Sequence, residues 1–416
     1  MRSVAGRSAA VLAAAALVLT GCGQGGPGGG GGKISGDKVV LGVINDQSGV
    51  YADLSGKNSV EAVNMAIADF KKKHPDSAIK DIEVVSADHQ NKPDLANSKA
   101  AELYDRQQAD IILDVPTSSA ALAVANVAKQ KKKLHINVGA ATTELSGKSC
   151  NKYTFHYAYD TYMLAYGTGT TLTQEGAKNW YIVYPDYAFG QDMNKSFTAA
   201  VEAGGGNVIK SDPTPFPNDN FSTFLLKAPK LNPKPDVIGT MQAGGDLVNL
   251  VKQYNEFKLA DKGVGLAVGL MFITDIHSLG VEAFEGVTFT DAWYWNFDDK
   301  NRKWADRFQA KTDTRPSFAH AGNYSAALQY LEAVERAGTD ESDAVVKELE
   351  GYEFDDVFAR NGKIRAEDHR MVHDAYLAKV KEKSEVSEEW DYEEIVSTIP
   401  ADKAFAPVGD TQCQMG

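Results

Sequence analysis

Four stretches of this chain carry small polar and aromatic residues at the points where predicted strands end. They read "NDQSGVYADLSG" from Asn45, "PTSSA" from Pro116, "GAATTEL" from Gly139 and "PDYAFGQD" from Pro185. In open parallel sheets, ligands bind at the carboxyl ends of the strands, where the following helices present unpaired N–H groups. We therefore expect these four stretches to form a site for a small molecule.

Motifs for phosphate binding and for catalysis fail on inspection. In "GVYADLSGKNS", Tyr51 stands where a phosphate-binding loop needs glycine and Asn58 where it needs a hydroxyl, and "TTELSGKS" has Thr142 in place of glycine. The sequence contains no G-x-S-x-G, H-E-x-x-H or C-x-x-C motif. An extracytoplasmic hydrolase remains an alternative, although no residue stands out as its nucleophile. We expect a protein that is not an enzyme and that uses no cofactor.

Two histidines have a spacing that would suit a metal ion on a helix. His369 and His373 are four residues apart. The surrounding "HRMVHDAYLAKV" favours a strand after a hairpin turn at Asn361 and Gly362, and no nearby cysteine or third histidine completes a site. We interpret both as surface histidines and predict no metal site.

Apolar strands alternate with amphipathic helices along most of the chain. The first series has strands at 39–45, 82–88, 110–116 and 134–141 and helices at 59–70, 95–104 and 119–128. The second series has strands at 179–185, 208–212, 236–242 and 266–274 and helices at 162–175, 192–203, 221–226 and 247–257. Strand-helix alternation at this spacing is typical of doubly wound parallel sheets. We predict an α/β fold with two Rossmann-like lobes.

The third portion is less regular and suits a chain that crosses back between the lobes. "GVTFTDAWYWN" favours a strand, and 301–311 and 323–337 favour helices. We expect lobe 1 to contain 36–157 and 276–348 and lobe 2 to contain 158–275 and 349–416, joined by a hinge of several strands.

The N-terminus carries an export signal. Arg2 and Arg7 precede an apolar run at 9–19 that is too short to span a bilayer. The following "LTGC" resembles the lipobox of bacterial lipoproteins, which implies a signal peptide at 1–21 and a lipid on Cys22. The glycine-rich segment at 22–35 would then be a flexible tether. An ordinary secretory signal that happens to contain a cysteine is the alternative.

The chain has three cysteines, so a lipid on Cys22 leaves one possible pair. Cys150 and Cys413 would form a disulfide in an oxidising compartment. Two unpaired thiols are the alternative. A bridge over so long an interval would stabilise the fold by roughly 5 kcal/mol in the chain-entropy model.

Charge and hydropathy limit the partners. The net charge of −13 argues against a nucleic-acid surface, and no later run of 18 apolar residues offers a membrane span. We expect an extracytoplasmic body, anchored to the cell membrane by its lipid and monomeric, with no nucleic-acid partner.

Together, the strand-end stretches resemble the leucine/isoleucine/valine-binding family of ABC-importer solute-binding proteins, which have the type I periplasmic binding fold. The most specific parts are "SGVYADLSGKNSVEAVNMAIADF", "AATTEL" and "DYAFGQD", and the resemblance covers nearly all of 38–400. It implies a two-lobed protein that closes on a small molecule and delivers it to the permease and ATPase subunits of an importer. With the aromatic group "DAWYWN", the sequence looks most like members associated with aromatic acids, although core packing would explain Trp293 and Trp295 equally well.

The resemblance also implies where a ligand carboxylate would bind. Ser118 and Ser119 match the positions that receive it, and Thr142 and the backbone near Ala140 match its second support. A carboxylate at two helix starts would gain dipole stabilisation and charge-assisted hydrogen bonds. For each hydroxyl the alternative is an ordinary helix N-cap.

Five further residues complete the predicted site. Phe189 stands where amino-acid-binding members usually have tyrosine, and Tyr187 could supply a second ring. Asp246 aligns with the acidic position that pairs with a substrate ammonium, its alternative being an N-cap for the next helix. Tyr51 would project from the first loop, unless it is a packed loop aromatic. His277 follows the last strand of lobe 2 and could hydrogen-bond a ligand.

These residues predict a solute-binding lipoprotein of an ABC importer with a small carboxylate ligand. We prefer an aromatic acid, because Phe189 replaces the tyrosine of amino-acid binders. A branched-chain amino acid is the alternative, and Asp246 would then pair with its ammonium. A ligand-sensing ectodomain of the same fold, reporting to a signalling partner, is an alternative of a different class.

Overall fold

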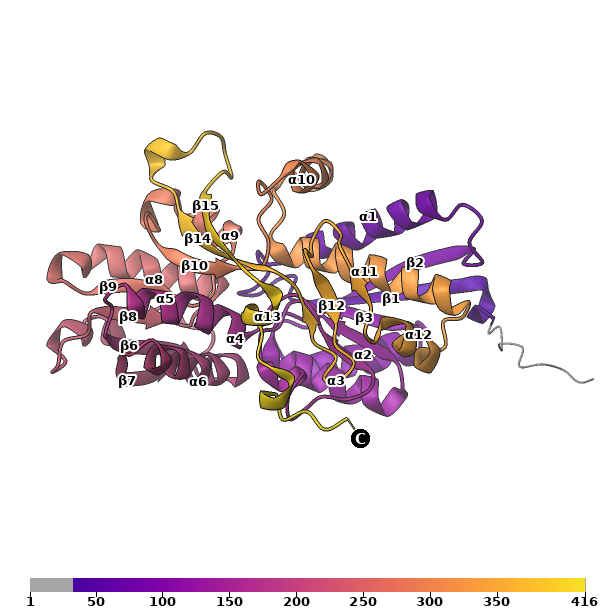
Figure 1. The fold of residues 1–416 in the computed structure, drawn as a ribbon, viewed down its shortest axis with the longest axis horizontal. Helices are drawn as coiled ribbons and strands as arrows, with labels where there is room; N and C mark the ends of the chain where they lie inside the picture. Colours follow the sequence, from indigo (N-terminus) through magenta and orange to yellow (C-terminus); the bar gives the residue numbers. More distant parts are fainter. Residues whose placement is uncertain (1–32, 416) are drawn as a thin grey trace, which may run out of the picture. The chain divides into compact units, whose positions relative to one another are not determined.

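The computed structural model describes residues 33–415, which belong to one compact unit (Figure 1). The predicted signal peptide, Cys22 and nearly all of the glycine-rich tether lie outside the described residues, so the lipid anchor stays a prediction. Between residues 33 and 415, no helix is long and apolar enough to cross a bilayer.

A five-stranded parallel sheet forms the centre of the first lobe. Its strand order is β2-β1-β3-β4-β5. The strands are β1 (Lys38–Asn45), β2 (Asp81–Asp88), β3 (Ile111–Asp114), β4 (Leu134–Asn137) and β5 (Thr154–His156). Side chains of β1 alternate between two cores, because Val39 and Leu41 pack on one face of the sheet and Val40 and Ile44 on the other. Helices therefore have to cover both faces.

Different helices cover the two faces of this sheet. The face of Val39 packs against α1 (Asn58–Lys73) and α11 (Phe318–Ala337), and α12 (Ser342–Leu349) packs on α11. The face of Val40 packs against α2 (Pro93–Asp105) and α3 (Ser118–Lys131). The return of α11 joins a distant part of the sequence to the first lobe, and Asn323 Nδ2 donates a 3.2 Å hydrogen bond to Ser59 Oγ at this contact.

The second lobe is built around a four-stranded parallel sheet with the order β7-β6-β8-β9. Its strands are β6 (Asn179–Pro185), β7 (Asn207–Thr214), β8 (Val237–Thr240) and β9 (Gly265–Val268). Its helices are α4 (Thr161–Leu164), α5 (Thr170–Gln174), α6 (Ala188–Ala203), α7 (Ser222–Leu225), α8 (Gly244–Glu256) and α9 (Ile273–Leu279). A π-helical turn at Ala165–Gly169 joins α4 to α5, so the helix predicted at 162–175 is present with one irregular turn. The predicted α/β fold with two lobes is confirmed.

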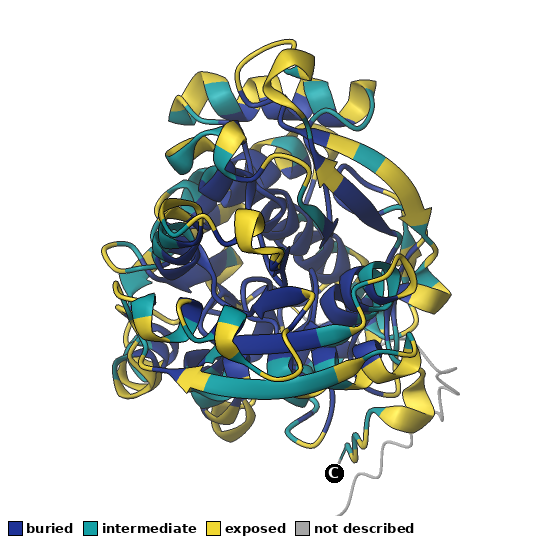
Figure 2. Cartoon of the chain, turned by 90° about the vertical axis from the view of Figure 1, so that its left-hand side faces the viewer, coloured by how far each residue is buried: buried dark blue, intermediate teal, exposed yellow. Residues whose placement is uncertain are grey.

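An antiparallel sheet joins the third portion of the chain to the second lobe. β10 (Thr288–Asp291) pairs with β14 (Ala375–Val380), which pairs with β15 (Glu393–Ile399), and β10 lies beside β9 (Figure 1). A small sheet contains β11 (Glu353–Phe354), β12 (Gly362–Ile364) and β13 (Met371–Val372), and the remaining helices are α10 (Asp299–Thr312) and α13 (Ala401–Ala404). Figure 2 shows buried residues on the inner strands and exposed residues on the outer turns.

The strand predicted across "GVTFTDAWYWN" is shorter than expected, because it ends at Asp291. Beyond it, the indole N–H of Trp293 donates to the Val357 carbonyl and that of Trp295 to the Trp390 carbonyl, both at 2.8 Å. Both indoles are buried. They are therefore core residues whose N–H groups are satisfied within the fold.

The prediction that His369 and His373 lie at the surface is wrong. Both are fully buried. His373 contacts the Ala158 and Asp374 carbonyls through its two ring nitrogens, and His369 Nε2 lies 3.0 Å from a Glu350 carboxylate oxygen. The chain folds back on itself here, so these polar rings find partners inside the protein.

The predicted disulfide is confirmed. Cys150 and Cys413 are bonded, with Cα atoms 5.6 Å apart and a sequence separation of 263. The bridge ties the C-terminal segment to the loop after β4. This segment is also held by Arg365, which donates to the Ala406 carbonyl.

We expect loss of this disulfide to lower the free energy of unfolding by up to about 5 kcal/mol, because the unfolded chain regains the entropy of a very long loop. Cys150→Ser, Cys413→Ser and the double variant should give the same reduced melting temperature, since each removes the same bond. Thermal unfolding monitored by circular dichroism measures this. A melting temperature equal to that of the parent protein would contradict a stabilising role.

Candidate functional site

The loops after β1 and β6 bring two tyrosines into contact between the lobes. The hydroxyls of Tyr51 and Tyr187 lie 2.6 Å apart. The ring of Phe216 lies against both, with centroid distances of 5.4 Å to Tyr51 and 4.4 Å to Tyr187. Burial raises the pKa of both phenols above the ordinary value, so they stay protonated and act as hydrogen-bonding groups.

A close backbone approach accompanies this aromatic contact. The Gly245 N–H in the second lobe donates a 3.1 Å hydrogen bond to the Val50 carbonyl in the first. At the preceding Gly244, φ is +54° and an added Cβ would lie 2.6 Å from the Val50 oxygen. Glycine is therefore required here both for its backbone conformation and for the space.

Ser118 is the first residue of α3 and is fully buried. Its hydroxyl has no hydrogen-bond partner within residues 33–415. The N-cap of α3 is Thr117, so Ser118 is not the ordinary helix cap that was the alternative interpretation. Ser119 follows it and is partly exposed. A buried hydroxyl without a partner at a helix N-terminus is suited to a ligand that accepts a hydrogen bond.

The loop after β4 lies beside Ser118, but its polar groups are already engaged. A Cβ at Gly139 would lie 2.7 Å from the Cα of Pro116, which shows how closely the two loops pack. The Ala140 N–H donates to Asn137 Oδ1, and its carbonyl lies 2.8 Å from His156 Nε2. The backbone of Ala140 thus has internal partners for both of its groups.

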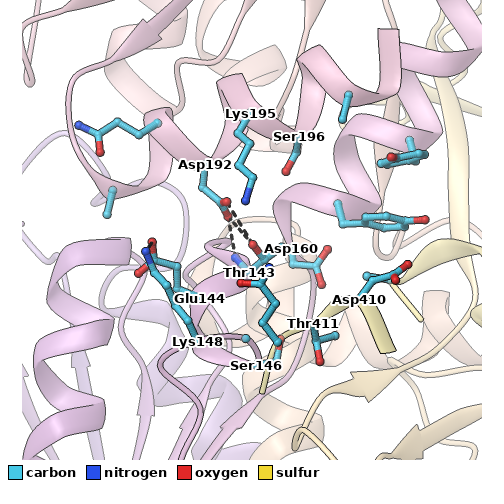
Figure 3. A pocket seen from close by; sticks show the side chains of 18 of the residues that line it. Thr143, Glu144, Ser146, Lys148, Asp160, Asp192, Lys195, Ser196, Asp410 and Thr411 are labelled. Atoms are coloured by element: carbon cyan, nitrogen blue, oxygen red, sulfur yellow. Dashed lines mark hydrogen bonds and ion pairs between the residues drawn. The ribbon is translucent and has the colours of Figure 1, made fainter. Parts of the chain in front are cut away.

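Thr142 is the N-cap that the alternative interpretation described. Its hydroxyl accepts from the Glu144 N–H at 3.4 Å and donates to Asp192 Oδ2 at 3.3 Å. The next residue, Thr143, donates to the same carboxylate through its N–H at 2.7 Å and through its hydroxyl at 2.9 Å (Figure 3). The second support predicted for a ligand carboxylate is therefore occupied by a carboxylate of the protein.

Two aromatic residues join the site without having been singled out from the sequence. Tyr159 is buried, and its hydroxyl donates to the Gly139 carbonyl at 2.7 Å. Phe216 contacts both central tyrosines, as described above, and Phe189 is buried 5.9 Å from Tyr187. Each missed residue follows a strand end, and this position is the signal that would have found it. For Tyr159, the preceding strand has three residues and leaves little pattern.

Asp246 lies in the first turn of α8 and is 2% exposed. Its N-cap alternative does not apply, because the N-cap is Ala243. Asp246 Oδ2 accepts one hydrogen bond, from the Asn218 N–H at 3.0 Å, and no ion pair reaches Asp246 within residues 33–415. Burial raises the pKa of this carboxyl to about 7. The group would therefore gain from a ligand that donates a hydrogen bond or carries a positive charge.

His277 does not join the other predicted residues. It is exposed, its ring stacks on Trp390 at 3.7 Å, and Nδ1 lies 2.9 Å from the Tyr392 hydroxyl. His277 belongs to the last turn of α9, which places its side chain against the segment between β14 and β15. We therefore exclude it from the proposed site.

A cavity of about 460 Å³ lies beside the contact between Thr143 and Asp192 (Figure 3). Its walls come from the loop after β4, α4, α6 and the C-terminal segment, and they include Thr143, Asp160, Asp192 and Asp410. Tyr51, Tyr187 and Asp246 do not line it. Ser118, whose hydroxyl has no hydrogen-bond partner in the described residues, does not line it either, so the cavity and the predicted ligand-binding residues are separate candidates.

The family model for periplasmic binding proteins matches residues 38–385. The chain belongs to the periplasmic binding protein family. Proteins of this family are extracytoplasmic solute-binding proteins and not enzymes, so the expected family and the absence of an enzymatic role are confirmed. A search of curated proteins found no match.

Solved structures agree with this assignment. A periplasmic binding protein from Burkholderia mallei is 43% identical with a TM-score of 0.87, and the match covers 92% of this chain and 100% of the other. A branched chain amino acid ABC transporter periplasmic ligand-binding protein from Burkholderia xenovorans LB400 is 36% identical with a TM-score of 0.80, covering 91% and 99%.

The fold is also shared with a more distant protein. A solute binding protein of an ABC transporter from Rhodopseudomonas palustris BisB5, in complex with 3,4-dihydroxy benzoic acid, is 23% identical with a TM-score of 0.76. That match covers 88% of this chain and 98% of the other.

The raised pKa of Asp246 predicts a pH-dependent stability. Its carboxyl has a pKa of about 7 in the folded protein against 3.8 for an unperturbed aspartate, so the unfolded chain loses its proton first as pH rises. The contribution of Asp246 to stability therefore falls between about pH 4 and 7, by at most about 4 kcal/mol at 1.4 kcal/mol per pKa unit.

We expect Asp246→Asn to raise the melting temperature of the protein without ligand at pH 8 and to have little effect at pH 4, where the carboxyl is protonated in the folded chain and close to half protonated in the unfolded chain. Thermal melts across this pH range measure the difference. Asp261→Asn, at an exposed aspartate of the same lobe, is the control. An equal effect of Asp246→Asn at both pH values would contradict a buried, high-pKa carboxyl.

Proposed function

We propose that this protein is the solute-binding lipoprotein of an ABC importer, which closes its two lobes on a small carboxylate ligand and delivers it to the permease. The observation that carries the proposal is the buried, unpartnered hydroxyl of Ser118 at a helix N-terminus, and the aromatic contact between the lobes supports it. An aromatic acid is the preferred ligand.

The carboxylate end of the ligand would bind at the start of α3. The hydroxyl of Ser118, with Ser119 beside it, lies in the first turn of this 14-residue helix, whose N-terminal N–H groups and dipole favour a negative charge. Thr142 and Ala140 support the loop next to it, since their own hydrogen-bonding groups are engaged within the protein. Ser118 and Ser119 therefore carry the main contact.

The ring end of the ligand would lie among the aromatic residues. Tyr51, Tyr187 and Phe216 form a contiguous group, and Phe189 extends it. A flat ring gains area burial and offset stacking from such neighbours. A ring hydroxyl would donate to Asp246, which has accepting capacity beyond its single hydrogen bond from Asn218. The Rhodopseudomonas palustris protein with bound 3,4-dihydroxy benzoic acid has the same fold, which is consistent with this preference.

A branched-chain amino acid is the second candidate, and Asp246 is the observation that favours it. An α-ammonium in a closed site must be paired, and Asp246 is a buried carboxylate with no ion pair in the described part of the chain. The 36% identical relative is described as a branched chain amino acid ABC transporter protein. Because the pKa of Asp246 is about 7, binding through an ammonium would weaken by up to tenfold per pH unit below that value.

Isothermal titration calorimetry with 4-hydroxybenzoate and with leucine would separate the two candidates. We expect micromolar binding of the aromatic acid and no binding of leucine. Ser118→Ala should weaken binding of the acid about 10- to 100-fold, because a hydrogen bond to a charged group contributes about 1.5–3 kcal/mol. Ser98→Ala, at an exposed serine of α2, is the matched control.

Two results would change these conclusions. Tight leucine binding that is lost in Asp246→Ala would favour the amino acid. No heat with any carboxylate from a panel of aromatic acids and amino acids would contradict the proposed function.

We also propose that a lipid on Cys22 anchors the protein and that 22–35 acts as its tether. The body would be monomeric. Its first lobe would contain 36–157 and 276–348, and its second lobe 158–275 and 349–416. The packing of α11 on α1 and of α12 on α11 supports the later part of 276–348 as first lobe, whereas α9 and β10 pack against α8 and β9 and so favour the second lobe for residues 276–291. Anchoring would keep the body beside its permease while leaving it free to rotate.

We expect Cys22→Ala to move the protein from the membrane fraction to the soluble fraction of bacterial cells that express it, because the acyl chains would no longer be attached. Immunoblots of fractionated cells measure this. Cys150→Ser is the control, since it removes a cysteine without touching the anchor. A Cys22→Ala protein that stays in the membrane fraction would contradict lipidation at this residue.

A further inference from the structure

Asp192 is a buried carboxylate that several hydroxyl and N–H groups surround. It lies on α6 and is 9% exposed. Its oxygens accept from the hydroxyls of Thr142, Thr143 and Thr161 at 3.3, 2.9 and 2.7 Å, and from the Thr143 N–H at 2.7 Å. Within residues 33–415 no lysine or arginine forms an ion pair with it. The direct contacts of this carboxylate are therefore hydrogen bonds, and the Lys148 ammonium adds a longer-range attraction.

The donors come from both sides of the inter-lobe boundary. Thr142 and Thr143 belong to the loop after β4 in the first lobe, whereas Asp192 belongs to α6 in the second. Thr161 begins α4, where the chain enters the second lobe, and its N–H donates to the Ala141 carbonyl. One carboxylate thus joins the two lobes next to the first crossing of the chain.

The same donors have the chemistry of an anion site. Two hydroxyls and one N–H at the start of a helical turn are groups that would hold a free carboxylate. In this structure Asp192 fills that place (Figure 3). Separation of the lobes would leave both the carboxylate and its donors in need of new partners, so the contact favours the closed arrangement.

We propose that Asp192 is a latch between the lobes, a positioning residue that favours closure without contacting the ligand. Its role in ligand retention rests on the proposed function, whereas its role in holding the lobes together does not. The latch orients the loop at Thr142 and Thr143, which packs beside Ser118, and it would slow the release of a bound ligand by disfavouring opening.

Chemical rescue tests this proposal without knowledge of the natural ligand. Asp192→Ala removes the carboxylate and leaves its donors exposed to the cavity of about 460 Å³, through which a small anion can enter. In the purified full-length protein we expect the melting temperature to fall by roughly 4–10 °C. Sodium formate at 100 mM should restore at least half of that loss, and sodium chloride at the same concentration should not.

Glu202→Ala is the matched control, because Glu202 is an exposed carboxylate on the same helix and forms no ion pair in the described part of the chain. It should neither lower the melting temperature nor respond to formate. Equal effects of formate and chloride on Asp192→Ala, or a melting temperature equal to that of the parent protein, would overturn the latch.

A second measurement reports opening directly. We expect small-angle X-ray scattering to give a larger radius of gyration for Asp192→Ala than for the parent protein, and formate to reverse the increase.

If Asp192→Ala does not fold, Asp192→Asn is the second variant, because it keeps the shape of the side chain. The asparagine amide replaces one carboxylate oxygen by an NH2 group, which cannot accept the hydrogen bonds that this oxygen accepted. We therefore expect the lobes of Asp192→Asn to open, without rescue by formate because the side chain still fills the space. An unchanged radius of gyration for Asp192→Asn would overturn the proposal. A protein that binds no carboxylate in the calorimetric panel would contradict the proposed function while leaving the formate result intact.

Discussion

The two lobes meet where strands of both parallel sheets end, and the other features of the site depend on that contact. Parallel strands place their following loops at one edge of a sheet, so the loops after β1 and β6 can face each other across the boundary. The contact between Tyr51 and Tyr187 joins these two loops, and the hydrogen bond from Gly245, at the start of α8, to Val50 adds a second contact across the boundary. Burial at this boundary excludes water and makes each polar group depend on a partner.

The polar groups at the boundary differ in how far their hydrogen-bonding capacity is used. Asp192 accepts from four donors, three of them at 2.7–2.9 Å, and both backbone groups of Ala140 have partners. Ser118 has no partner in the described residues, and Asp246 accepts one hydrogen bond while burial raises its pKa. Groups whose hydrogen bonds are all formed within the protein stabilise the closed arrangement, and groups with remaining hydrogen-bonding capacity are available to a ligand. This division separates the residues that hold the lobes from those suited to binding.

The C-terminal segment connects this site to the rest of the fold. After β15 the chain runs beside the crossing at α4, where Asp160 lies 3.0 Å from the buried guanidinium of Arg370. Phe405 covers that guanidinium at 4.3 Å, and the disulfide from Cys413 to Cys150 fixes the segment to the loop after β4. The same loop carries Thr142 and Thr143. The disulfide, the ion pair and the Asp192 contact therefore restrain one short stretch of the first lobe.

The sequence alone determined the alternation of strands and helices, the two lobes and the pairing of Cys150 with Cys413, because periodicity and cysteine count are local or arithmetical properties. It also placed Ser118, Thr142, Tyr187 and Asp246 at strand ends. Only the tertiary structure decided which of them keep free hydrogen-bonding capacity, since the partners of Thr142 lie fifty residues away on α6 and those of His277 more than a hundred residues away. The burial of His369 and His373 and the position of Tyr159 were likewise set by long-range packing, which a single sequence does not encode as a pattern.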